Sequence, residues 1–281
     1  MVPEASAAAP WLERGAHAAG LLAAALAAGR GAARLSLFGN EGIGAGGAVK
    51  VAQNLHPHSS IEDLDLTRCG LGDQGAEALA TALPRARALK ELCIGRNGLG
   101  PTGCRHLARA LAGARAPAML SLRDNRVGDE GAAALAEALE SNRGLTELEL
   151  SGNGLGNPGA GALGEALLKN RKLATLCLQD NRIGDAGAAG LAVGLPANRH
   201  LQELDLSGND IGNAGVGQLA KALQANEFLE TLSLERNRVD GEVLGALEEI
   251  FEARSSLRQP QEARQDRCDP GRGPTSSEIW P

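Results

Sequence analysis

Aliphatic residues recur along most of the chain in the pattern Leu-x-x-Leu-x-Leu-x-x-Asn. The closing polar residue returns every 28 residues, at Cys69, Asn97, Asn125, Asn153, Asn181, Asn209 and Asn237. An eighth copy, with Leu35, Leu37 and Asn40, lies 29 residues before Cys69, and in the fourth copy Pro117 replaces the first leucine. A fixed period of this length indicates stacked copies of one structural unit.

Within each copy, the hydrophobic period changes from that of a strand to that of a helix. Between Leu201 and Asn209 the leucines alternate with Glu203 and Asp205, which predicts a short strand with one buried face. After the asparagine, apolar residues recur at helical spacing. A polar residue before each helix is expected to cap that same helix, at Asp73, Asp129, Asn157, Asp185 and Asn213. Each copy is therefore predicted to be a strand followed by a helix.

Two other residue types keep a fixed place in the copies. The recurring asparagine has both a donor and an acceptor, so we expect it to bind turn backbone of its own copy and of the next. Glycines recur near the helix starts, at Gly75, Gly103, Gly131, Gly159, Gly187 and Gly215. Glycine weakens a helix by roughly 0.5–1 kcal/mol relative to alanine, so these positions predict close packing between neighbouring helices.

The alternation of strands and helices predicts an α/β solenoid. Each helix returns the chain to the same edge, so the strands form one parallel sheet, and the wider helices force a curve with the sheet inside. We predict one such domain at residues 11–254, with a half-copy helix at 11–31 and eight repeats at 32–254. Residues 1–10 are expected to be flexible, and the apolar-poor segment 255–281 to be disordered.

The N-terminal segment Ala18–Ala28 is apolar but is preceded by Glu4 instead of a basic region, which favours a half-copy helix over a targeting peptide. It is also too short to cross a membrane. Cys93 and Cys177 share one strand position three repeats apart, about 14 Å at ~4.8 Å per strand, so they cannot form a disulfide. Reduced cysteines favour a cytoplasmic or nuclear protein.

Composition excludes several functions. The net charge is −6, and no basic run alternates with aromatic residues, so we expect neither nucleic acid nor a membrane as partner. We expect a monomer without cofactor or catalytic residues, because the histidines lie away from the serine and cysteine columns. His56 and His58 could hold a metal but lack further ligands nearby, and we interpret them as a loop.

The outward-pointing strand residues form two columns with one residue per repeat. Acidic residues dominate these columns, at Asp63, Asp65, Glu91, Glu147, Glu149, Glu203 and Asp205. A concave surface would concentrate their negative field. We therefore predict that this face binds a basic segment of a protein partner; the alternative is a solvated face that keeps the protein soluble.

The repeats are identified as members of the leucine-rich repeat family. Their 28-residue length and the helical pattern Gly-Ala-x-x-Leu-Ala-x-x-Leu resemble the ribonuclease-inhibitor-like subclass. That subclass alternates two repeat types, as LRDNRV, LQDNRI and LERNRV alternate here with LSGNGL and LSGNDI. The chain resembles the repeat regions of NOD-like receptors, although it has no Walker motif, and Ran GTPase-activating proteins, although its tail is charge-balanced.

The resemblance implies a non-catalytic scaffold for protein–protein interactions, with two alternatives. One is a GTPase-activating regulator of a small GTPase, which would use a rim of arginines at the strand ends, Arg68, Arg96, Arg123, Arg126 and Arg236. Surface arginines paired with Asp124 or Asp180 are the simpler interpretation of that rim. The other alternative is a repeat region related to NOD-like immune sensors.

Overall fold

The computed structural model describes residues 15–21, 23–24, 34–112 and 117–255. This part of the chain contains one eight-stranded parallel sheet whose strands follow one another in chain order. The strands are β1 (Arg34–Ser36), β2 (Asp63–Asp65), β3 (Glu91–Cys93), β4 (Met119–Ser121), β5 (Glu147–Glu149), β6 (Thr175–Cys177), β7 (Glu203–Asp205) and β8 (Thr231–Ser233). The predicted strand positions are confirmed in all eight repeats.

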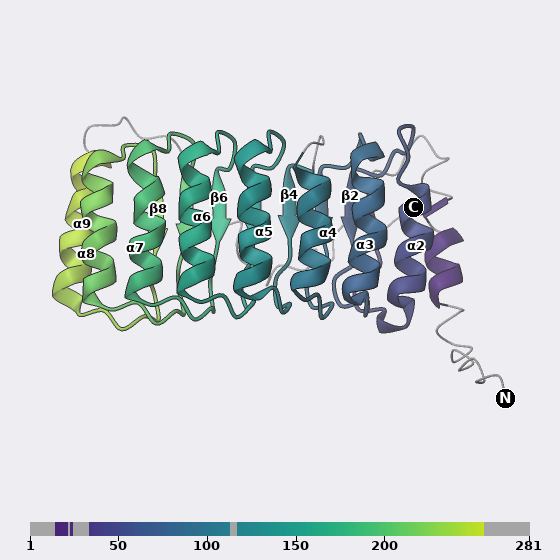
Figure 1. The fold of residues 1–281 in the computed structure, drawn as a ribbon, viewed down its shortest axis with the longest axis horizontal. Helices are drawn as coiled ribbons and strands as arrows, with labels where there is room; N and C mark the ends of the chain where they lie inside the picture. The colour runs from purple at the N-terminus through teal and green to yellow at the C-terminus, as the bar shows by residue number, and fades with distance from the viewer. Residues whose placement is uncertain (1–14, 22, 25–33, 113–116, 256–281) are drawn as a thin grey trace, which may run out of the picture.

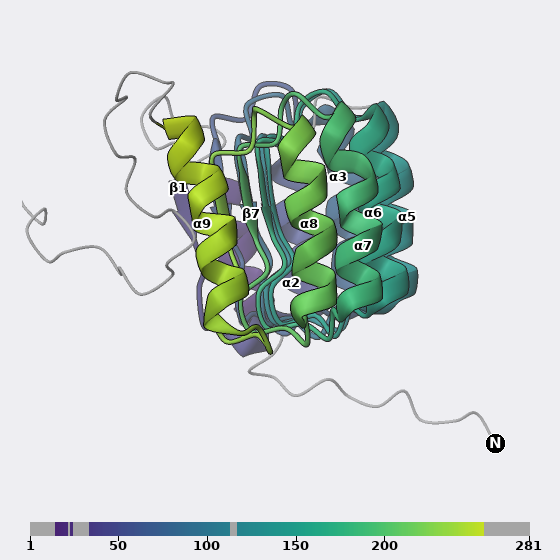
Figure 2. The ribbon, with the colours of Figure 1, turned by 90° about the vertical axis from the view of Figure 1, so that its left-hand side faces the viewer.

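A helix follows each strand and packs beside the helix of the next repeat (Figure 1). The helices are α2 (Gly44–Asn54), α3 (Gly72–Ala82), α4 (Pro101–Leu111), α5 (Gly128–Ser141), α6 (Asn157–Lys169), α7 (Asp185–Gly194), α8 (Asn213–Ala225) and α9 (Gly241–Ser255). Seen end-on, the helices of the middle repeats, α5 to α7, bow away from the sheet, so the helices form the outer layer of an arc (Figure 2). The predicted α/β solenoid with a parallel inner sheet is confirmed.

The core lies between the two layers. The central leucine of each strand points into it, and from Leu64 to Leu204 this side chain is at most 1% exposed. At the C-terminal end of the stack, Leu232 of β8 is only half-buried, because no further strand follows it in the described chain. Leu247 of α9 is buried there. The core is therefore continuous through the described repeats and closes less completely at its last strand.

The N-terminal stretch is helical at residues 15–21 and 23–24, and its Ala16, Ala19 and Ala23 are buried. This helix lies beside α2 (Figure 1), where Ala16 faces Gly47. The remainder of the predicted half-copy helix, the predicted flexible residues 1–10 and the predicted tail beyond Ser255 lie outside the described residues. None of the helices in the described ranges is long and apolar enough to cross a membrane.

The asparagine ladder runs in the opposite direction to the prediction. Asn97 accepts hydrogen bonds from the backbone N–H groups of Cys69 (2.8 Å) and Leu71 (3.2 Å), and it donates to the carbonyls of Leu66 and its own repeat's Gly95. Its second partner is thus the preceding repeat and not the next. The reason is that the N–H groups at each strand end point toward the following repeat, so an acceptor there must reach back.

The predicted helix caps also act between repeats. Asp185 Oδ1 accepts from the N–H groups of Gly212 (2.7 Å) and Gly215 (2.9 Å), which belong to the start of α8 in the next repeat. No side chain of its own repeat caps α7, because its N-cap residue is Gly184, and the N–H groups at its start bond to Asn157 of the preceding repeat. The prediction that each acid caps its own helix is therefore wrong. The same bridge to the next helix is made by Asp73, Asp129 and Asn157.

These bridges explain the recurring glycines. A Cβ atom at Gly215 would lie 2.7 Å from Asp185 Oδ1, and one at Gly103 would lie 2.6 Å from Asp73 Oδ1. The close packing predicted for these positions is present. The capping carboxylate of the preceding repeat is the nearest constraint at Gly103, Gly159 and Gly215, whereas at Gly75 and Gly131 the nearest side chains are Leu71 and Val127 of the same repeat.

Candidate functional site

The inner face is formed by the two outward-pointing residues of each three-residue strand. Because the strands are parallel and in register, these residues align across the sheet as the two predicted columns. The first column is Arg34, Asp63, Glu91, Met119, Glu147, Thr175, Glu203 and Thr231. The second is Ser36, Asp65, Cys93, Ser121, Glu149, Cys177, Asp205 and Ser233. The structure thus brings all seven predicted acids to one face, in two groups.

The N-terminal group consists of Asp63 and Asp65 on β2 and Glu91 on β3, and the two β2 acids are engaged by β1. Arg34 Nε donates to Asp63 at 3.2 Å, and Ser36 Oγ donates to Asp65 Oδ2 at 3.1 Å. Asp65 Oδ1 accepts a further bond from the backbone N–H of Thr67. The carboxylates of β2 therefore already have hydrogen-bond donors within the chain.

The thiol of Cys93 on β3 lies close enough to several acids of the inner face to feel their charges. Burial raises the pKa of its thiol to about 12, with further increases from the charges of Asp65, Glu91 and Glu147. A thiol with that pKa stays protonated at neutral pH, so it is neither a nucleophile nor a metal ligand there. Its role on this face is that of a small, neutral side chain.

The C-terminal acids surround a single strand. Thr175 of β6 has Glu147 of β5 on one side and Glu203 of β7 on the other. Cys177 of β6 lies in the same way between the outward residues of β5 and β7 in the second column. We call these four acids the acidic quartet; its members are Glu147, Glu149, Glu203 and Asp205. All four are half-buried, and Cys177 between them is buried.

The Glu149 carboxylate lies in a desolvated environment. Burial raises its pKa above the ordinary value of 4.5, and the charge of Asp205 raises it further, while bonds to Ser151 and the charge of Arg123 lower it. Its Oε1 accepts a hydrogen bond from the Ser151 backbone N–H at 2.7 Å. The charged form of Glu149 is thus held in an unfavourable, desolvated position beside a second acid.

The predicted arginine rim is mostly paired with carboxylates of the same chain. Arg68 contacts Glu41 at 2.9 Å, Arg96 and Arg123 contact Asp124 at 2.8 and 3.5 Å, and Arg236 contacts Asp180 at 3.0 Å. The pairing with Asp124 and Asp180 that the sequence suggested is present. Arg126 is exposed and forms no ion pair with another described residue. The rim therefore offers fewer available charges than its sequence indicates.

The rim also explains the two alternating repeat types. Asp124 and Asp180 adopt positive φ angles of 53°, and the equivalent residues of the following repeats are Gly152 and Gly208. A Cβ atom at either glycine would lie 2.2 Å from the aspartate Oδ1 of the preceding repeat. The aspartate repeats therefore require glycine repeats after them.

A second asparagine ladder, which was not predicted from the sequence, lies at the turn that leads into each strand from β5 to β8. It consists of Asn142, Asn170, Asn198 and Asn226, each at most 2% exposed. Each Oδ1 accepts from two backbone N–H groups of its own turn, and each Nδ2 donates to a leucine carbonyl of the preceding repeat. The same 28-residue interval could have revealed it.

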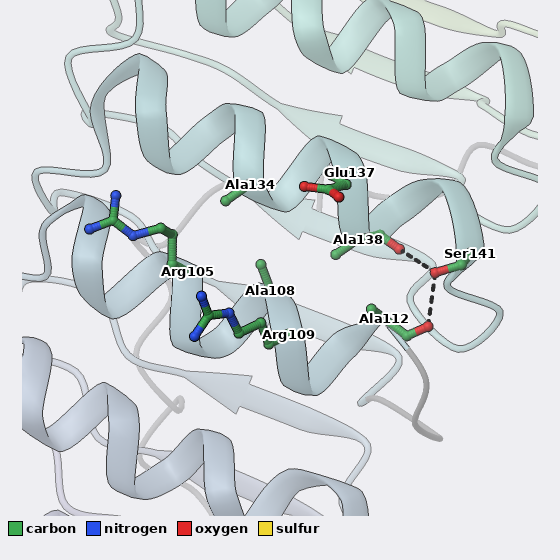
Figure 3. A pocket seen from close by; sticks show the side chains of 8 residues that line it. All are labelled: Arg105, Ala108, Arg109, Ala112, Ala134, Glu137, Ala138 and Ser141. Atoms are coloured by element: carbon green, nitrogen blue, oxygen red, sulfur yellow. Dashed lines mark hydrogen bonds between the residues drawn. The ribbon is translucent and has the colours of Figure 1, made fainter.

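On the outer face, a shallow groove of about 430 Å³ lies between α4 and α5 (Figure 3). Short side chains form its floor, Arg105 and Arg109 line it from α4, and Glu137 lines it from α5. Ser141 Oγ donates to the carbonyls of Ala112 (2.8 Å) and Ala138 (3.3 Å), so this hydroxyl serves the backbone. The lining residues include no paired nucleophile and base.

Metal and thiol chemistry find no site in the described ranges. No group of three or more His, Cys, Asp or Glu residues there is placed to hold a metal ion, and the rings of His56 and His58 are 6.4 Å apart. Cys69, Cys93, Cys104 and Cys177 are free thiols, while Cys268 lies outside the described residues. Burial raises the pKa of Cys69 to about 11 and that of Cys104 to about 12, so neither thiol ionises at neutral pH.

The fold defines a repeat solenoid of the α/β class. A family model described as "Leucine Rich repeat" matches residues 58–80, 120–136, 141–164, 169–192 and 197–220. The matched repeats are therefore leucine-rich repeats, as the sequence predicted. The family model indicates no enzyme family.

Two solved structures share part of this architecture. One, titled "Leiomodin-1 Actin-Binding Site 2 (ABS2)", is 21% identical, with a TM-score of 0.41, and the match covers 46% of this chain and 75% of the other. The second is a tropomodulin C-terminal domain from Caenorhabditis elegans, 17% identical with a TM-score of 0.46, over 65% of this chain and 94% of the other. No curated protein sequence matches the chain.

Proposed function

We propose that this protein is a non-catalytic binding module whose inner face holds a positively charged segment of a protein partner. The observation that carries the proposal is the register of the sheet, which gathers seven carboxylates in two columns that contain only one basic residue, Arg34. Charges of one sign gathered on a concave surface attract an oppositely charged ligand and orient it.

The dimensions of the face set the size of the segment. From β2 to β7 there are five strand spacings, about 24 Å at ~4.8 Å each. An extended chain of about seven residues or a helix of about 16 residues spans that distance. A single basic segment can therefore reach both acidic groups at once.

The alternative function, regulation of a small GTPase through the arginine rim, has less support. Arg68, Arg96, Arg123 and Arg236 already contact carboxylates of the chain. A rim used for phosphoryl transfer needs an arginine that can reach the nucleotide. Among the predicted rim residues, Arg126 alone forms no ion pair with another described residue.

The test is the binding of a fluorescent nona-arginine peptide, measured by anisotropy at two salt concentrations. Replacing the four quartet acids with serine should weaken binding by about tenfold or more, because exposed ion pairs contribute roughly 0.2–1 kcal/mol each. The matched control removes four exposed acids of the outer layer, Glu77, Glu137, Glu165 and Glu242, and should change the affinity less than twofold. Equal losses in the two variants would mean that net charge, and not this face, binds the peptide.

A further inference from the structure

Two neighbouring helices of the outer layer carry opposite charges. α4 contains two arginines, Arg105 and Arg109, and no acidic residue, whereas α5 contains four acids and no basic residue. Arg109 and Glu137 hold the same position in consecutive repeats, and they line the groove between α4 and α5 from its two sides (Figure 3). The α4 side of this groove is therefore positive and the α5 side is negative.

Arg109 and Glu137 are not engaged within the chain. Both side chains are exposed, and neither forms an ion pair or a side-chain hydrogen bond with another residue of the described ranges. Arg105, by contrast, contacts Glu130 at 3.6 Å and donates to Thr102 Oγ1 at 3.0 Å. The groove thus has one available charge of each sign, on opposite sides and at the same level of the two helices.

The floor of the groove consists of short side chains. Ala108 and Ala138 are buried, and Ala112 and Ala134 are half-buried. The hydroxyl of Ser141, which also lines the groove, already donates to two backbone carbonyls. The distance between packed helices depends on the side chains at their contact, so a floor of alanines lets another helix layer approach closely.

We propose that this groove is the contact between two copies of the protein, related by a two-fold axis that runs along the groove. Such an axis places α4 of each copy opposite α5 of the other, at the same level. Arg109 of each copy then faces Glu137 of the second copy, so the available charges of one chain match those of the other. An axis across the helices would instead place Arg109 opposite Arg109, which like charges disfavour.

This dimer is weak and leaves the inner face accessible. The helices form the outer layer of an arc (Figure 2), so two copies touch mainly over α4 and α5. Small contacts are typical of transient interfaces, and each exposed ion pair contributes little. The monomer expected from the sequence is then the form at low protein concentration, at which stability and peptide binding are measured. Because the groove lies on the layer opposite the sheet, the inference is independent of the proposed function.

Sedimentation velocity of the full chain, over a concentration series that reaches about 1 mM, tests the dimer. The two-fold axis doubles the effect of each substitution, because Arg109→Glu places acids opposite acids at two contacts and Glu137→Arg does the same with basic residues. Each variant should weaken self-association by about tenfold or more. The matched control is Lys221→Glu, which reverses an exposed charge at the equivalent position of α8 and should self-associate as the parent does.

Mixing the two variants separates a loss of folding from a loss of charge complementarity. In a mixture of Arg109→Glu and Glu137→Arg, both contacts across the axis again join opposite charges, so a heterodimer should form with about the parent's affinity. A parent that stays monomeric at the highest concentration would overturn the proposal. A dimer that both charge reversals leave intact, or a mixture that stays monomeric, would also overturn it. None of these outcomes changes the expected binding of nona-arginine at the inner face.

Discussion

The N-terminal and C-terminal halves of the solenoid share one 28-residue period but differ in how their repeats are joined. From α5 onward, four consecutive helices carry a side chain that bonds to the start of the next helix, at Asp129, Asn157, Asp185 and Asn213. In the N-terminal half, Asp73 has this role, while Ala45 and Pro101 occupy the equivalent positions and provide no acceptor. The second asparagine ladder likewise begins at Asn142, and Ala86 takes that position in the second repeat.

This difference coincides with the distribution of charge. Asp63 and Asp65 bond to Arg34 and Ser36 within the chain, whereas the quartet lies on the half whose turns are tied together by buried side chains. A rigid support holds charged groups in place and lowers the ordering cost when a partner binds. The proposed binding face therefore has its more firmly tied support in the C-terminal half of the solenoid.

The largest expected effect comes from the second ladder, which only the C-terminal half contains. Asn198→Ala removes two donated bonds and two accepted bonds of 2.8 Å at a residue with no exposed surface. Leaving these buried backbone groups unpaired should lower the free energy of unfolding by about 2–4 kcal/mol. Urea denaturation followed by circular dichroism measures it.

The matched control for that prediction is the exposed Asn40 at the N-terminal end of the first ladder. Its side chain donates to two carbonyls of its own turn, at 2.8 and 3.3 Å, and bonds to no other repeat among the described residues, so Asn40→Ala should cost about 0.5 kcal/mol. Similar losses for Asn198→Ala and Asn40→Ala would show that the two halves are equally stable at their turns, contrary to the comparison.

A smaller effect is expected from the bridges between helices. Asp185→Ala removes the acceptor for two N–H groups at the start of α8, and the loss of a cap costs typically about 1 kcal/mol. Asp210→Ala, in which an exposed ion pair to Arg238 is lost, should cost less. The midpoints of urea unfolding compare them; a larger loss for Asp210→Ala would refute a structural role for the bridges.

Much of this fold could be predicted from the sequence, because strand positions, their register and the two columns follow from a period and from alternation alone. The direction of the ladders could not. The local sequence around Asp185 would be the same whether this residue capped its own helix or the next one. Which helix it caps depends on how the helices of neighbouring repeats lie beside each other. The 28-residue spacing is symmetric with respect to the preceding and following repeats, so it also left the partner of Asn97 undetermined.

The candidate site could likewise be predicted only in part, because the sequence identified its residues but not their neighbours in space. Its seven acids could be listed from the sequence, but their unequal environments depend on neighbours one or two strands away. Nothing in the local sequence distinguishes Asp65, whose second oxygen binds Ser36, from Asp205, whose partner strand offers Cys177 at that position. Asn142, Asn170, Asn198 and Asn226 were visible as a periodic series, yet their role became clear only from their burial.

The next prediction changes the N-terminal half to resemble the C-terminal half. Arg34→Ser removes the cation that pairs with Asp63, so the β2 acids should then attract the nona-arginine peptide. The gain should be about twofold in affinity, because an exposed pair is worth roughly 0.2–1 kcal/mol. When Arg34→Ser is added to the variant in which the four quartet acids are serine, the affinity for nona-arginine should also rise about twofold. No gain in either background would indicate that Arg34 does not limit the N-terminal acids.

The smallest effect concerns the pH dependence of the C-terminal half. The pKa of Glu149 is raised in the folded state by burial, so the folded protein binds more protons than the unfolded chain between the ordinary value near 4.5 and the raised one. Stability therefore falls as the pH rises through that interval. Glu149→Gln should have a slightly higher Tm than the parent at pH 7, and the difference should shrink as the pH is lowered toward 4.5.

Binding should respond to the same substitution with the opposite sign. Glu149→Gln removes one carboxylate from the acidic quartet, so nona-arginine should bind about two- to threefold more weakly even though the free protein is more stable. Glu137→Gln, on the exposed outer layer, should alter neither quantity. A parallel loss of Tm and affinity in Glu149→Gln would show that this carboxylate supports the fold, whereas opposite changes show that the charge is maintained at the expense of stability because the partner requires it.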